Sequence, residues 1–520
     1  MTVPHVETYT AKLVFEQAGM NEDSYEQSII EVLRDELEYE HLYGPDVIRT
    51  SNRYDDAFLP GAIEHSLKSI NPSLNRRAID GAITRLKEIE GGSLVAKNKV
   101  FMDMLQNGVE VRWFDGAEDR TDIVKLIDFD EPRRNSFHVV NQWTYIERGT
   151  NKRPDVIVFV NGLPLVLFEL KSPARAEADN ADAYQQIQNY KKQIPSLFTY
   201  NAFCVISDML HTKVGTITAS ESRFVEWKST DGSYETTQFA DWKTPLHGMF
   251  PKERLIDILR NYILYSGDAK ILAGYHQYFA VNKALESVRE AIGGSGKGGV
   301  FWHTQGSGKS LSMVFLAHLL QNAIDSPTLV VITDRNDLDS QLFNQFSMCS
   351  DFLRQTPIQA QSRSDLSHQI ASRRANGIVF TTMQKFAEGD AALSERENVV
   401  VLVDEAHRGQ YGFEEKYDRD GKKHTGTALL IRRALPNATF VGFTGTPISA
   451  EDRSTREVFG DYIDVYDMTQ AVEDDATRPV FYESRVVALK LDQEILSKVD
   501  AEYEKSVSYT HLTLPTNSRV

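Results

Sequence analysis

The spacing of apolar residues divides the chain into two regions with different patterns. In the first region, a stretch from about residue 23 to residue 39 carries apolar residues at helical spacing and predicts an amphipathic helix. Two apolar runs, "VIVFV" and "LPLVLFEL", come later and flank Asn161 and Gly162, a dipeptide typical of hairpin turns. The polar helical stretch "ADAYQQIQNYKKQI" follows, so the pattern predicts one α/β unit over residues 1–260.

The second region, residues 261–465, alternates short apolar strands with helical segments such as "KSLSMVFLAHLLQNA". Its strand-like runs are "GGVFWH", "TLVVITD", "GIVFTT", "VVVLVDE" and "ATFVGFTG". This alternation predicts a doubly wound parallel sheet with its ligand chemistry at the carboxyl ends of the strands. Residues 466–506 extend beyond this unit, and residues 507–520 look like translated adapter or vector sequence and are not expected to belong to the fold.

Composition and charge narrow the class of protein. With 520 residues, 41% hydrophobic and 25% charged, the chain is long enough for two or three globular domains. It shows neither a signal peptide nor an apolar run long enough to span a membrane, so a cytoplasmic protein is expected. Cys204 and Cys349 are too few for a disulfide framework or a cysteine-rich zinc site. The net charge of −17 excludes a chain that coats nucleic acid through a uniform basic surface.

The stretch "HTQGSGKS" predicts a phosphate-binding loop because it lies between a predicted strand and a predicted helix. Backbone N–H groups at Gly306 and Gly308 can surround phosphate oxygens, Lys309 supplies a positive charge, and Ser310 can bind Mg²⁺. His303 departs from the full pattern, which has glycine at this position, and an ordinary glycine-rich turn is the alternative. The candidate nucleotide-binding residues of the loop are Thr304, Gln305, Gly306, Ser307, Gly308, Lys309 and Ser310.

Two further polar segments end later strands of the same region. "VVVLVDEAH" places Asp404 and Glu405 after an apolar strand, where carboxylates can hold Mg²⁺ and polarise the attacking water. "FVGFTGTP" ends its strand with a small polar turn at residues 444–447, positioned to sense the nucleotide. A strand capped by solvated acids is the alternative for the first segment, but the phosphate loop and the acids come in the right order on the predicted strands.

The hairpin around Asn161 carries three charged residues at its open end. Glu169 and Lys171 are two residues apart on one strand and share a face, and Asp155 precedes the other strand. Two carboxylates can hold a divalent metal against a phosphate, while a lysine positions or deprotonates water. A surface hairpin with a Glu169–Lys171 ion pair is the alternative, but these charges end an apolar run.

This assignment depends on the register of the hairpin. A two-residue turn at Asn161 and Gly162 would pair Asp155 with Phe168 and leave Glu169 on the opposite face. A three-residue turn that includes Leu163, with a glycine-assisted bulge, would place Asp155 opposite Glu169. The metal site requires Asp155 opposite Glu169, so the sequence predicts the three-residue turn.

The motifs of the second region resemble the first lobe of superfamily 2 helicases and translocases. The resemblance rests on "GSGKS" at 306–310, "DEAH" at 404–407, "TGTP" at 444–447, "TTMQ" at 381–384 and "YHQYFAV" around Gln277. It implies a RecA-like lobe that binds ATP and Mg²⁺. In this reading Gln277 reads adenine, Ser310 and Asp404 hold the metal, and Glu405 activates water.

The first region resembles PD-(D/E)xK nucleases, and the whole chain resembles the restriction (R) subunit of type I restriction-modification enzymes. Asp155 with "ELK" matches the nuclease signature, "QIQNY" supplies the supporting Gln186 and Tyr190, and "TDRNDLDSQL" lies at 333–342. The resemblance covers about residues 20–500 and implies Mg²⁺-dependent cleavage of unmodified double-stranded DNA by Asp155, Glu169 and Lys171. It also implies ATP-driven translocation and partnership with modification and specificity subunits.

Several expectations follow from this resemblance. Glu26 lies where such nucleases often place another acid, although Glu31 is nearby and a solvated helix face is the simpler reading. Because partner subunits would recognise the sequence, a basic channel on an acidic protein is expected. Only about seventy residues follow "TGTP", too few for a second motor lobe, and residues 466–506 are expected to form a connector and the start of that lobe. This polypeptide is therefore expected to bind ATP, hydrolyse it poorly and not translocate.

Two other readings stay open at this stage. The chain could be a binding module whose vestigial nuclease site only docks on partner subunits. It could instead belong to another superfamily 2 nuclease-motor, such as a DNA-repair helicase.

Overall fold

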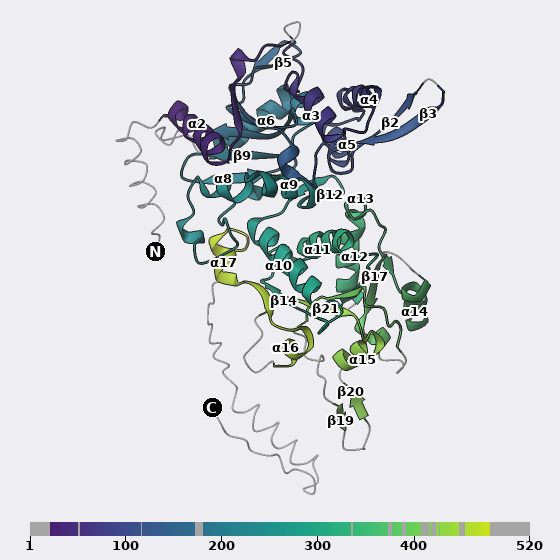
Figure 1. Ribbon diagram of the computed structural model, residues 1–520. Helices are drawn as coiled ribbons and strands as arrows, with labels where there is room; N and C mark the ends of the chain where they lie inside the picture. Colours follow the sequence, from purple (N-terminus) through teal and green to yellow (C-terminus); the bar gives the residue numbers. More distant parts are fainter. Residues whose placement is uncertain are drawn as a thin grey trace, which may run out of the picture. The chain divides into compact units, whose positions relative to one another are not determined.

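The computed structural model describes residues 21–49, 53–115, 117–171, 180–333, 336–372, 377–386, 392–406, 415–417, 423–425, 427–446 and 453–478 (Figure 1). The described residues up to Thr477 belong to one compact unit. None of the described helices is both long enough and apolar enough to cross a membrane. The adapter-like tail at 507–520 and most of the 466–506 segment lie outside the described residues.

The first region is built on a seven-stranded mixed sheet of order β1-β4-β7-β8-β9-β10-β11. Its central strands are wholly buried, which explains their continuous apolar sequence. β8 runs parallel to β9, and the connection between them contains helices α6 and α7. The strands are β1 (Glu40–Tyr43), β4 (Phe137–Asn141), β7 (Val156–Val160), β8 (Leu163–Leu170), β9 (Phe203–Ser207), β10 (Thr212–Gly215) and β11 (Val225–Glu226).

Helices and small hairpins surround this sheet. The amphipathic helix expected at about 23–39 is confirmed as α2 (Glu22–Glu31) and a π-helical turn at Val32–Glu36, and it begins with a capping box formed by Asn21 and Ser24. The other helices are α3 (Ala62–Ile70), α4 (Arg76–Lys87), α5 (Leu94–Asn107), α6 (Asn180–Gln193), α7 (Pro195–Phe198), α8 (Thr244–Met249) and α9 (Lys252–Asn261). The paired strands outside the sheet are β2 (Val109–Phe114) with β3 (Asp119–Val124), and β5 (Tyr145–Glu147) with β6 (Thr150–Lys152).

The turn between β7 and β8 differs from the predicted one. Val160 pairs directly with Leu163, so the turn contains only Asn161 and Gly162, both with positive φ (52° and 80°) as a type I′ turn requires. The prediction of a three-residue turn is therefore wrong. A β-carbon on Gly162 would lie 2.6 Å from the backbone nitrogen of Ile63, so close packing as well as conformation requires glycine here.

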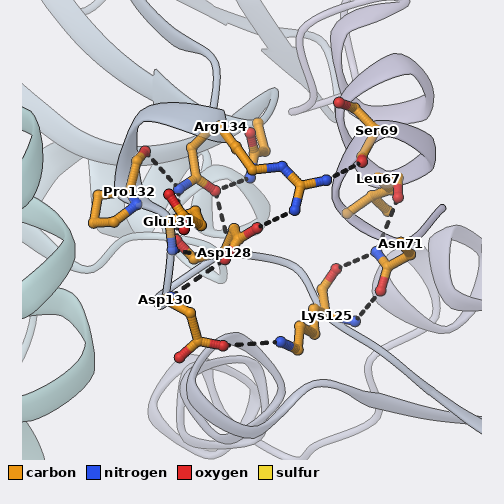
Figure 2. A network of polar contacts seen from close by, with 11 residues as sticks. Leu67, Ser69, Asn71, Lys125, Asp128, Asp130, Glu131, Pro132 and Arg134 are labelled. Atoms are coloured by element: carbon orange, nitrogen blue, oxygen red, sulfur yellow. Dashed lines mark hydrogen bonds and ion pairs between the residues drawn. The ribbon is translucent and has the colours of Figure 1, made fainter.

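A network of hydrogen bonds between Asn161 and the surrounding loops fixes this turn. Asn161 is fully buried, and its Nδ2 donates to Asn135 Oδ1 at 2.7 Å. Asn135 in turn donates through Nδ2 to the Asp128 carbonyl and accepts from the Asp128 backbone N–H, each at 2.8 Å. Figure 2 shows the next layer, in which Arg134 pairs with Asp128 at 3.2 Å and donates to the Ser69 carbonyl. The turn is thus fixed by the surrounding loops as well as by its own dipeptide.

The second region is a seven-stranded sheet of order β16-β17-β15-β18-β21-β14-β22, in which every pairing is parallel. The five predicted strands are confirmed, and the edge strands β16 and β22 were not predicted. The strands are β14 (Lys297–His303), β15 (Thr328–Thr333), β16 (Ile358–Gln359), β17 (Gly377–Thr382), β18 (Val399–Val403), β21 (Thr439–Thr444) and β22 (Tyr462–Tyr466).

Helices cover both faces of this parallel sheet, as a doubly wound fold requires (Figure 1). Leu329 and Val331 of β15 join the core cluster that includes α10, α11 and α12, whereas Val330 and Ile332 join the cluster that includes α14, α15 and α16. The helices are α10 (Tyr275–Ala291), α11 (Lys309–Ala323), α12 (Asn336–Met348), α13 (Ser350–Leu353), α14 (Arg363–Ser372), α15 (Thr427–Ala434), α16 (Arg453–Phe459) and α17 (Met468–Glu473). A small pair, β19 (Glu415–Tyr417) and β20 (Lys423–Thr425), lies between β18 and α15 in the chain.

The passage between the two regions is a hairpin, β12 (Ile263–Ser266) with β13 (Ala269–Leu272). Lys270 of this hairpin is almost fully buried, and its Nζ bonds to Asn98 Oδ1 (2.8 Å) and to the Asn201 carbonyl (2.6 Å). These bonds attach the hairpin, which follows residue 260, to the first region. The domain boundary at residue 260 therefore stays a prediction. Both cysteines, Cys204 and Cys349, are buried and free.

Candidate functional site

Asp155, Glu169 and Lys171 come together at the ends of two central strands, β7 and β8, of the first sheet. Val158 pairs with Val166 but Phe159 pairs with Pro164, so Leu165 is an extra, bulged residue in β8. The bulge shifts the register by one, and continuing the Val156–Phe168 pairing places Asp155 opposite Glu169. The expected juxtaposition is therefore present, although a bulge within the strand produces it and the turn does not.

Hydrogen bonds fix the orientation of this cluster. Asp155 Oδ2 accepts from the Leu170 backbone N–H at 2.8 Å, which ties the carboxylate to the neighbouring strand. Lys171 Nζ donates to Glu169 Oε1 at 2.7 Å and to the Leu170 carbonyl at 3.0 Å. Glu169 is only 3% exposed, and its Oε2 is buried with no hydrogen-bond partner among the described residues. A buried carboxylate oxygen without a donor is an acceptor that a cation could satisfy.

The electrostatics of the cluster agree with this reading. Burial, followed by the charge of Glu169, raises the pKa of Asp155 well above its usual value. Burial also raises the pKa of Glu169, opposed by Lys171. Burial alone would lower the pKa of the Lys171 amine, but Glu169 and Asp155 raise it above its usual value. Two carboxyl groups that resist ionisation side by side would gain from a divalent cation between them.

The supporting residues on α6 lie against the cluster. Tyr190 is 4% exposed and interacts with both Glu169 and Gln186, and burial together with the Glu169 charge raises its pKa. These contacts bring Gln186 and Tyr190 to the site at which the sequence predicts them.

The acids of the first helix take different positions. Glu26 is held by Asn141 Nδ2 and Gln142 Nε2, each at 2.7 Å, and burial raises its pKa. Glu31 is exposed. Glu22, in the first turn of α2, is the acid whose charge reaches Asp155, Glu169 and Lys171. Sequence reasoning missed Glu22, because its only local signal is an acid in a first helical turn.

The described residues contain no group of three or more histidine, cysteine, aspartate or glutamate side chains arranged to hold a metal. Asp155 and Glu169 supply two carboxylates, and the unpartnered Oε2 of Glu169 is a suitable oxygen ligand for Mg²⁺. Mg²⁺ commonly binds through one or two carboxylates and completes its shell with water and phosphate oxygens. The pair therefore fits a Mg²⁺ site that a phosphate would complete.

The phosphate loop lies at the carboxyl end of β14 and leads into α11. Gly306 and Gly308 have φ values of 88° and 85°, a conformation that favours glycine. Gln277 Nε2 donates to the Gly308 carbonyl at 3.1 Å, while its Oε1 accepts from the Gly274 backbone N–H at 3.0 Å. The structure thus places Gln277 against the phosphate loop, and its expected role in adenine recognition stays a prediction.

His303 occupies the position where the full motif has glycine, and the structure gives it a separate role. Its side chain is fully buried, and Nε2 bonds to Asp464 Oδ2 at 2.9 Å. Asp464 also accepts from Lys283 Nζ (2.7 Å) and Tyr234 OH (2.6 Å). Burial lowers the pKa of His303. The histidine therefore holds β14 to β22 and does not line the phosphate loop as a ligand.

The remaining motifs follow neighbouring strands of the second sheet, at the same carboxyl end as the phosphate loop. Asp404 follows β18 and its Oδ1 accepts from the Glu405 backbone N–H at 3.0 Å. Strand β21, which ends at Thr444, lies between β18 and β14. A β-carbon on Gly445 would collide with Lys309 Nζ, so the "TGTP" turn contacts the loop lysine. Gln305, Ser307 and Ser310 belong to the same phosphate loop. His407 and Pro447 lie outside the described residues.

Two other expected segments can be placed only in part. Thr381 and Thr382 of "TTMQ" end β17 and are buried, and Thr333 ends β15. Residues 334 and 335 lie outside the described residues. A basic channel stays a prediction.

Two family models match the chain. Residues 19–223 match the type I restriction enzyme R protein N terminus, and residues 276–512 match the SWI2/SNF2 ATPase. The second match, together with the parallel topology, identifies the second region as an α/β lobe of the superfamily 2 helicase type.

Two curated relatives of this chain are also type I restriction endonuclease subunits by name. The chain is 40% identical over 515 residues to the endonuclease subunit of the HindI type I restriction enzyme of Haemophilus influenzae, covering 94% of this chain and 49% of that protein. It is 34% identical over 530 residues to a Methanocaldococcus jannaschii protein provisionally named as the MjaIXP type I endonuclease subunit, covering 95% of this chain and 49% of that protein. The UvsW helicase of bacteriophage T4 is a distant structural neighbour, with 17% identity, a TM-score of 0.27 and coverage of 38% of this chain and 62% of that one.

The chain spans about half the length of the curated relatives it matches. The two family models follow one another along the chain in the same order as the two sheets described above. The chain belongs to the family of R (endonuclease) subunits of type I restriction enzymes.

Proposed function

We propose that this chain acts as the ATP-dependent translocase and endonuclease subunit of a type I restriction enzyme and cleaves unmodified double-stranded DNA. Residues 1–260 serve as a PD-(D/E)xK-type nuclease domain, residues 261–465 as the ATP-binding motor lobe, and residues 466–506 lead toward the second lobe of such motors. The observation that carries the proposal is the register across β7 and β8, which places Asp155 opposite Glu169 with Lys171 bonded to Glu169.

In cleavage, the two carboxylates would hold Mg²⁺ against the scissile phosphate. When bound, Mg²⁺ stabilises the negative charge that develops on the phosphate and the leaving oxygen. Asp155 is oriented for this task by the Leu170 N–H, and Glu169 offers its unpartnered Oε2. Glu169 and Asp155 raise the pKa of Lys171, so its protonated amine can orient the attacking water and balance charge.

The helix α6 supports this arrangement. Tyr190 and Gln186 pack beside Glu169 and restrict the orientation of its carboxylate. We assign them a positioning role, because nothing in their contacts requires direct interaction with the phosphate.

In the motor lobe, the residues of the phosphate loop would bind ATP. Backbone N–H groups of the loop surround the phosphates, Lys309 neutralises their charge, and Ser310 with Asp404 holds the Mg²⁺ of the nucleotide. Glu405 polarises the attacking water. Gln277 reads adenine after it releases the Gly308 carbonyl to which it is bonded in this structure.

The decisive experiment uses the chain assembled with the modification and specificity subunits of its own restriction system. Wild-type assemblies should nick unmodified duplex DNA only when Mg²⁺ is present. Asp155→Ala should abolish nicking and retain ATP binding, whereas Lys309→Ala should abolish ATP binding and retain nicking. Lys192→Ala, an exposed lysine on α6, is the matched control and should behave as wild type.

The same experiment distinguishes the alternatives. A wild-type chain that assembles but never cleaves would indicate a docking module with a vestigial nuclease site. A chain that cleaves with ATP but does not associate with modification and specificity subunits would indicate a nuclease-motor of another kind.

A further inference from the structure

Among the described residues, Arg49 is a buried cation without a hydrogen-bond or ion-pair partner. Arg49 is only 8% exposed, and all three of its guanidinium nitrogens are buried. Burying a charged group without a partner is energetically costly, so native proteins rarely retain one without a use for it.

The surroundings of Arg49 add a further unused donor. The guanidinium carbon lies 3.6 Å from the centroid of the Trp143 ring and 4.9 Å from that of Tyr54. Trp143 is fully buried, and its indole Nε1 also lacks an acceptor. Three guanidinium nitrogens and one indole N–H therefore lie together with no acceptor of their own. Stacking on an aromatic face offsets part of the cost of burial but satisfies none of these donors, and burial lowers the pKa of Arg49 to about 10.

This cluster lies at the edge of the sheet that carries the proposed cleavage site. β1 runs parallel to β4, and Tyr43 pairs with Asn141 at the carboxyl ends of both strands. The next residue after β4, Gln142, donates its backbone N–H to the Asp155 carbonyl at 2.9 Å. The segment leading from β4 to Trp143 thus leaves the sheet beside Asp155, and the segment leading from β1 to Arg49 leaves it one strand further out.

Large apolar side chains close to Arg49 in the sequence are exposed: Ile48 is 91% exposed, Tyr43 46% and Tyr54 38%. Exposed apolar side chains can contact a binding partner. Next to a duplex, such side chains contact sugars and groove walls, while arginine binds phosphate oxygens through its planar fork of N–H groups.

We propose that Arg49 binds a backbone phosphate of double-stranded DNA beside the cleavage site, and that Trp143 supports it. This inference rests on the proposed nuclease function and adds a DNA contact that lies outside the catalytic cluster. A phosphate that reaches the guanidinium group supplies the acceptors that its nitrogens lack. On a chain with a net charge of −17, DNA must be gripped at local sites of this kind.

The test compares Arg49→Met with the control Arg53→Gln in the full 520-residue chain. Methionine keeps a long apolar side chain against Trp143 and removes the charge. Arg53 lies on the same segment, but its side chain is 67% exposed and paired with Asp55. Binding of a short duplex is followed by fluorescence anisotropy over a series of KCl concentrations, and thermal unfolding is measured for each variant.

We expect Arg49→Met to bind the duplex about tenfold more weakly, with a salt dependence whose slope is smaller by about 1, because one phosphate contact is lost. Its unfolding midpoint should be equal to or higher than that of the wild type, because an unpaired buried charge has been removed. Arg53→Gln should change neither quantity. Equal DNA binding by Arg49→Met and wild type would overturn the inference. That result is also the one expected if the true partner of Arg49 is a protein carboxylate.

Two further arms keep the test decisive. If Arg49→Met does not fold, Arg49→Lys replaces it, since lysine keeps the charge but not the fork, and undiminished binding of the duplex by Arg49→Lys would overturn the inference. Inorganic phosphate, matched in ionic strength to KCl, is the second probe: stabilisation of the wild type by phosphate but not by duplex would reveal a small-anion site and overturn the DNA assignment. A wild-type chain that binds duplex while cleavage is absent would contradict the proposed function and leave Arg49 testable by binding alone.

Discussion

Asp155 lies across from Glu169 in the antiparallel pair of β7 and β8, although the turn between the strands contains only two residues. The extra residue that corrects the register is Leu165, which is fully buried in β8. A β-bulge of this kind re-aims the side chains that follow it. The proposed cleavage site therefore depends on a residue that has no chemistry of its own.

Deleting Leu165 should destroy cleavage without affecting the motor lobe. Removal of the bulged residue shifts Glu169 and Lys171 by one position relative to β7 and moves them to the opposite face. Mg²⁺-dependent plasmid nicking should be lost, while ATP binding, measured by fluorescence titration, should persist.

The matched control for this deletion is Leu165→Ala. It keeps the residue count and hence the register, so it should still nick DNA, although the free energy of unfolding should fall by about 2–5 kcal/mol. A deletion variant that cleaves as well as Leu165→Ala would contradict the role of the bulge.

The stability of the metal-free chain should depend on pH through Asp155. Its pKa is raised in the folded state, chiefly by burial and then by Glu169, so the folded state binds the proton more tightly than the unfolded state. The contribution is fully present below the usual aspartate pKa and is lost as pH rises through the higher folded value. The unfolding temperature of the wild type relative to Asp155→Asn should therefore fall with rising pH in this range.

Mg²⁺ should reverse this penalty. The ion stabilises both carboxylates in their charged form, so it should raise the unfolding temperature of the wild type at neutral pH and have a much smaller effect on Asp155→Asn. An equal Mg²⁺ shift in both proteins would place the bound ion elsewhere.

Lys270 should give a pH dependence of the opposite sign. Burial lowers the pKa of this lysine well below its usual value, so the unfolded state binds the proton more tightly. Stability should rise with pH from the folded pKa up to the usual lysine value of about 10.4. The difference in unfolding temperature between wild type and Lys270→Met should grow as pH is raised through this range, and a constant difference would contradict the assignment.

Restoring the consensus glycine at position 303 should harm the protein. His303→Gly would remove a buried side chain and its bond to Asp464, so we expect the free energy of unfolding to fall by about 2–5 kcal/mol. ATP affinity, measured on the folded fraction, should not increase, because the side chain of His303 faces Asp464 and not the phosphate loop. Tighter ATP binding would show that the histidine obstructs the loop.

The parts of the molecule that were predictable from the sequence are those encoded by neighbouring residues. The phosphate loop between β14 and α11, the Glu169–Lys171 pair and the acids after β18 each lie in one short segment, and strand alternation or strand ends fix their positions. The five predicted strands of the second sheet are apolar on both faces, a pattern typical of buried parallel strands.

The parts that were not predictable depend on contacts between distant segments. The length of the hairpin turn cannot be read from the sequence, because the bulge at Leu165 has no local signal in an unbroken apolar run. Glu22 approaches the cluster only because α2 packs near the strand ends, and Arg49 meets Trp143 only because β1 lies beside β4. Gln277 was predicted beside a nucleotide, and its bond to the Gly308 carbonyl arises from the packing of α10 on the loop.

Nicking of supercoiled plasmid by the purified 520-residue chain tests whether Asp155, Glu169 and Lys171 form a metal-dependent DNA cleavage site. Glu169→Gln keeps the shape of the side chain and removes the charge that would hold Mg²⁺. We expect nicking by the wild type in Mg²⁺ but not in EDTA, and none by Glu169→Gln. Equal Mg²⁺-dependent nicking by the wild type and Glu169→Gln would refute the cleavage site.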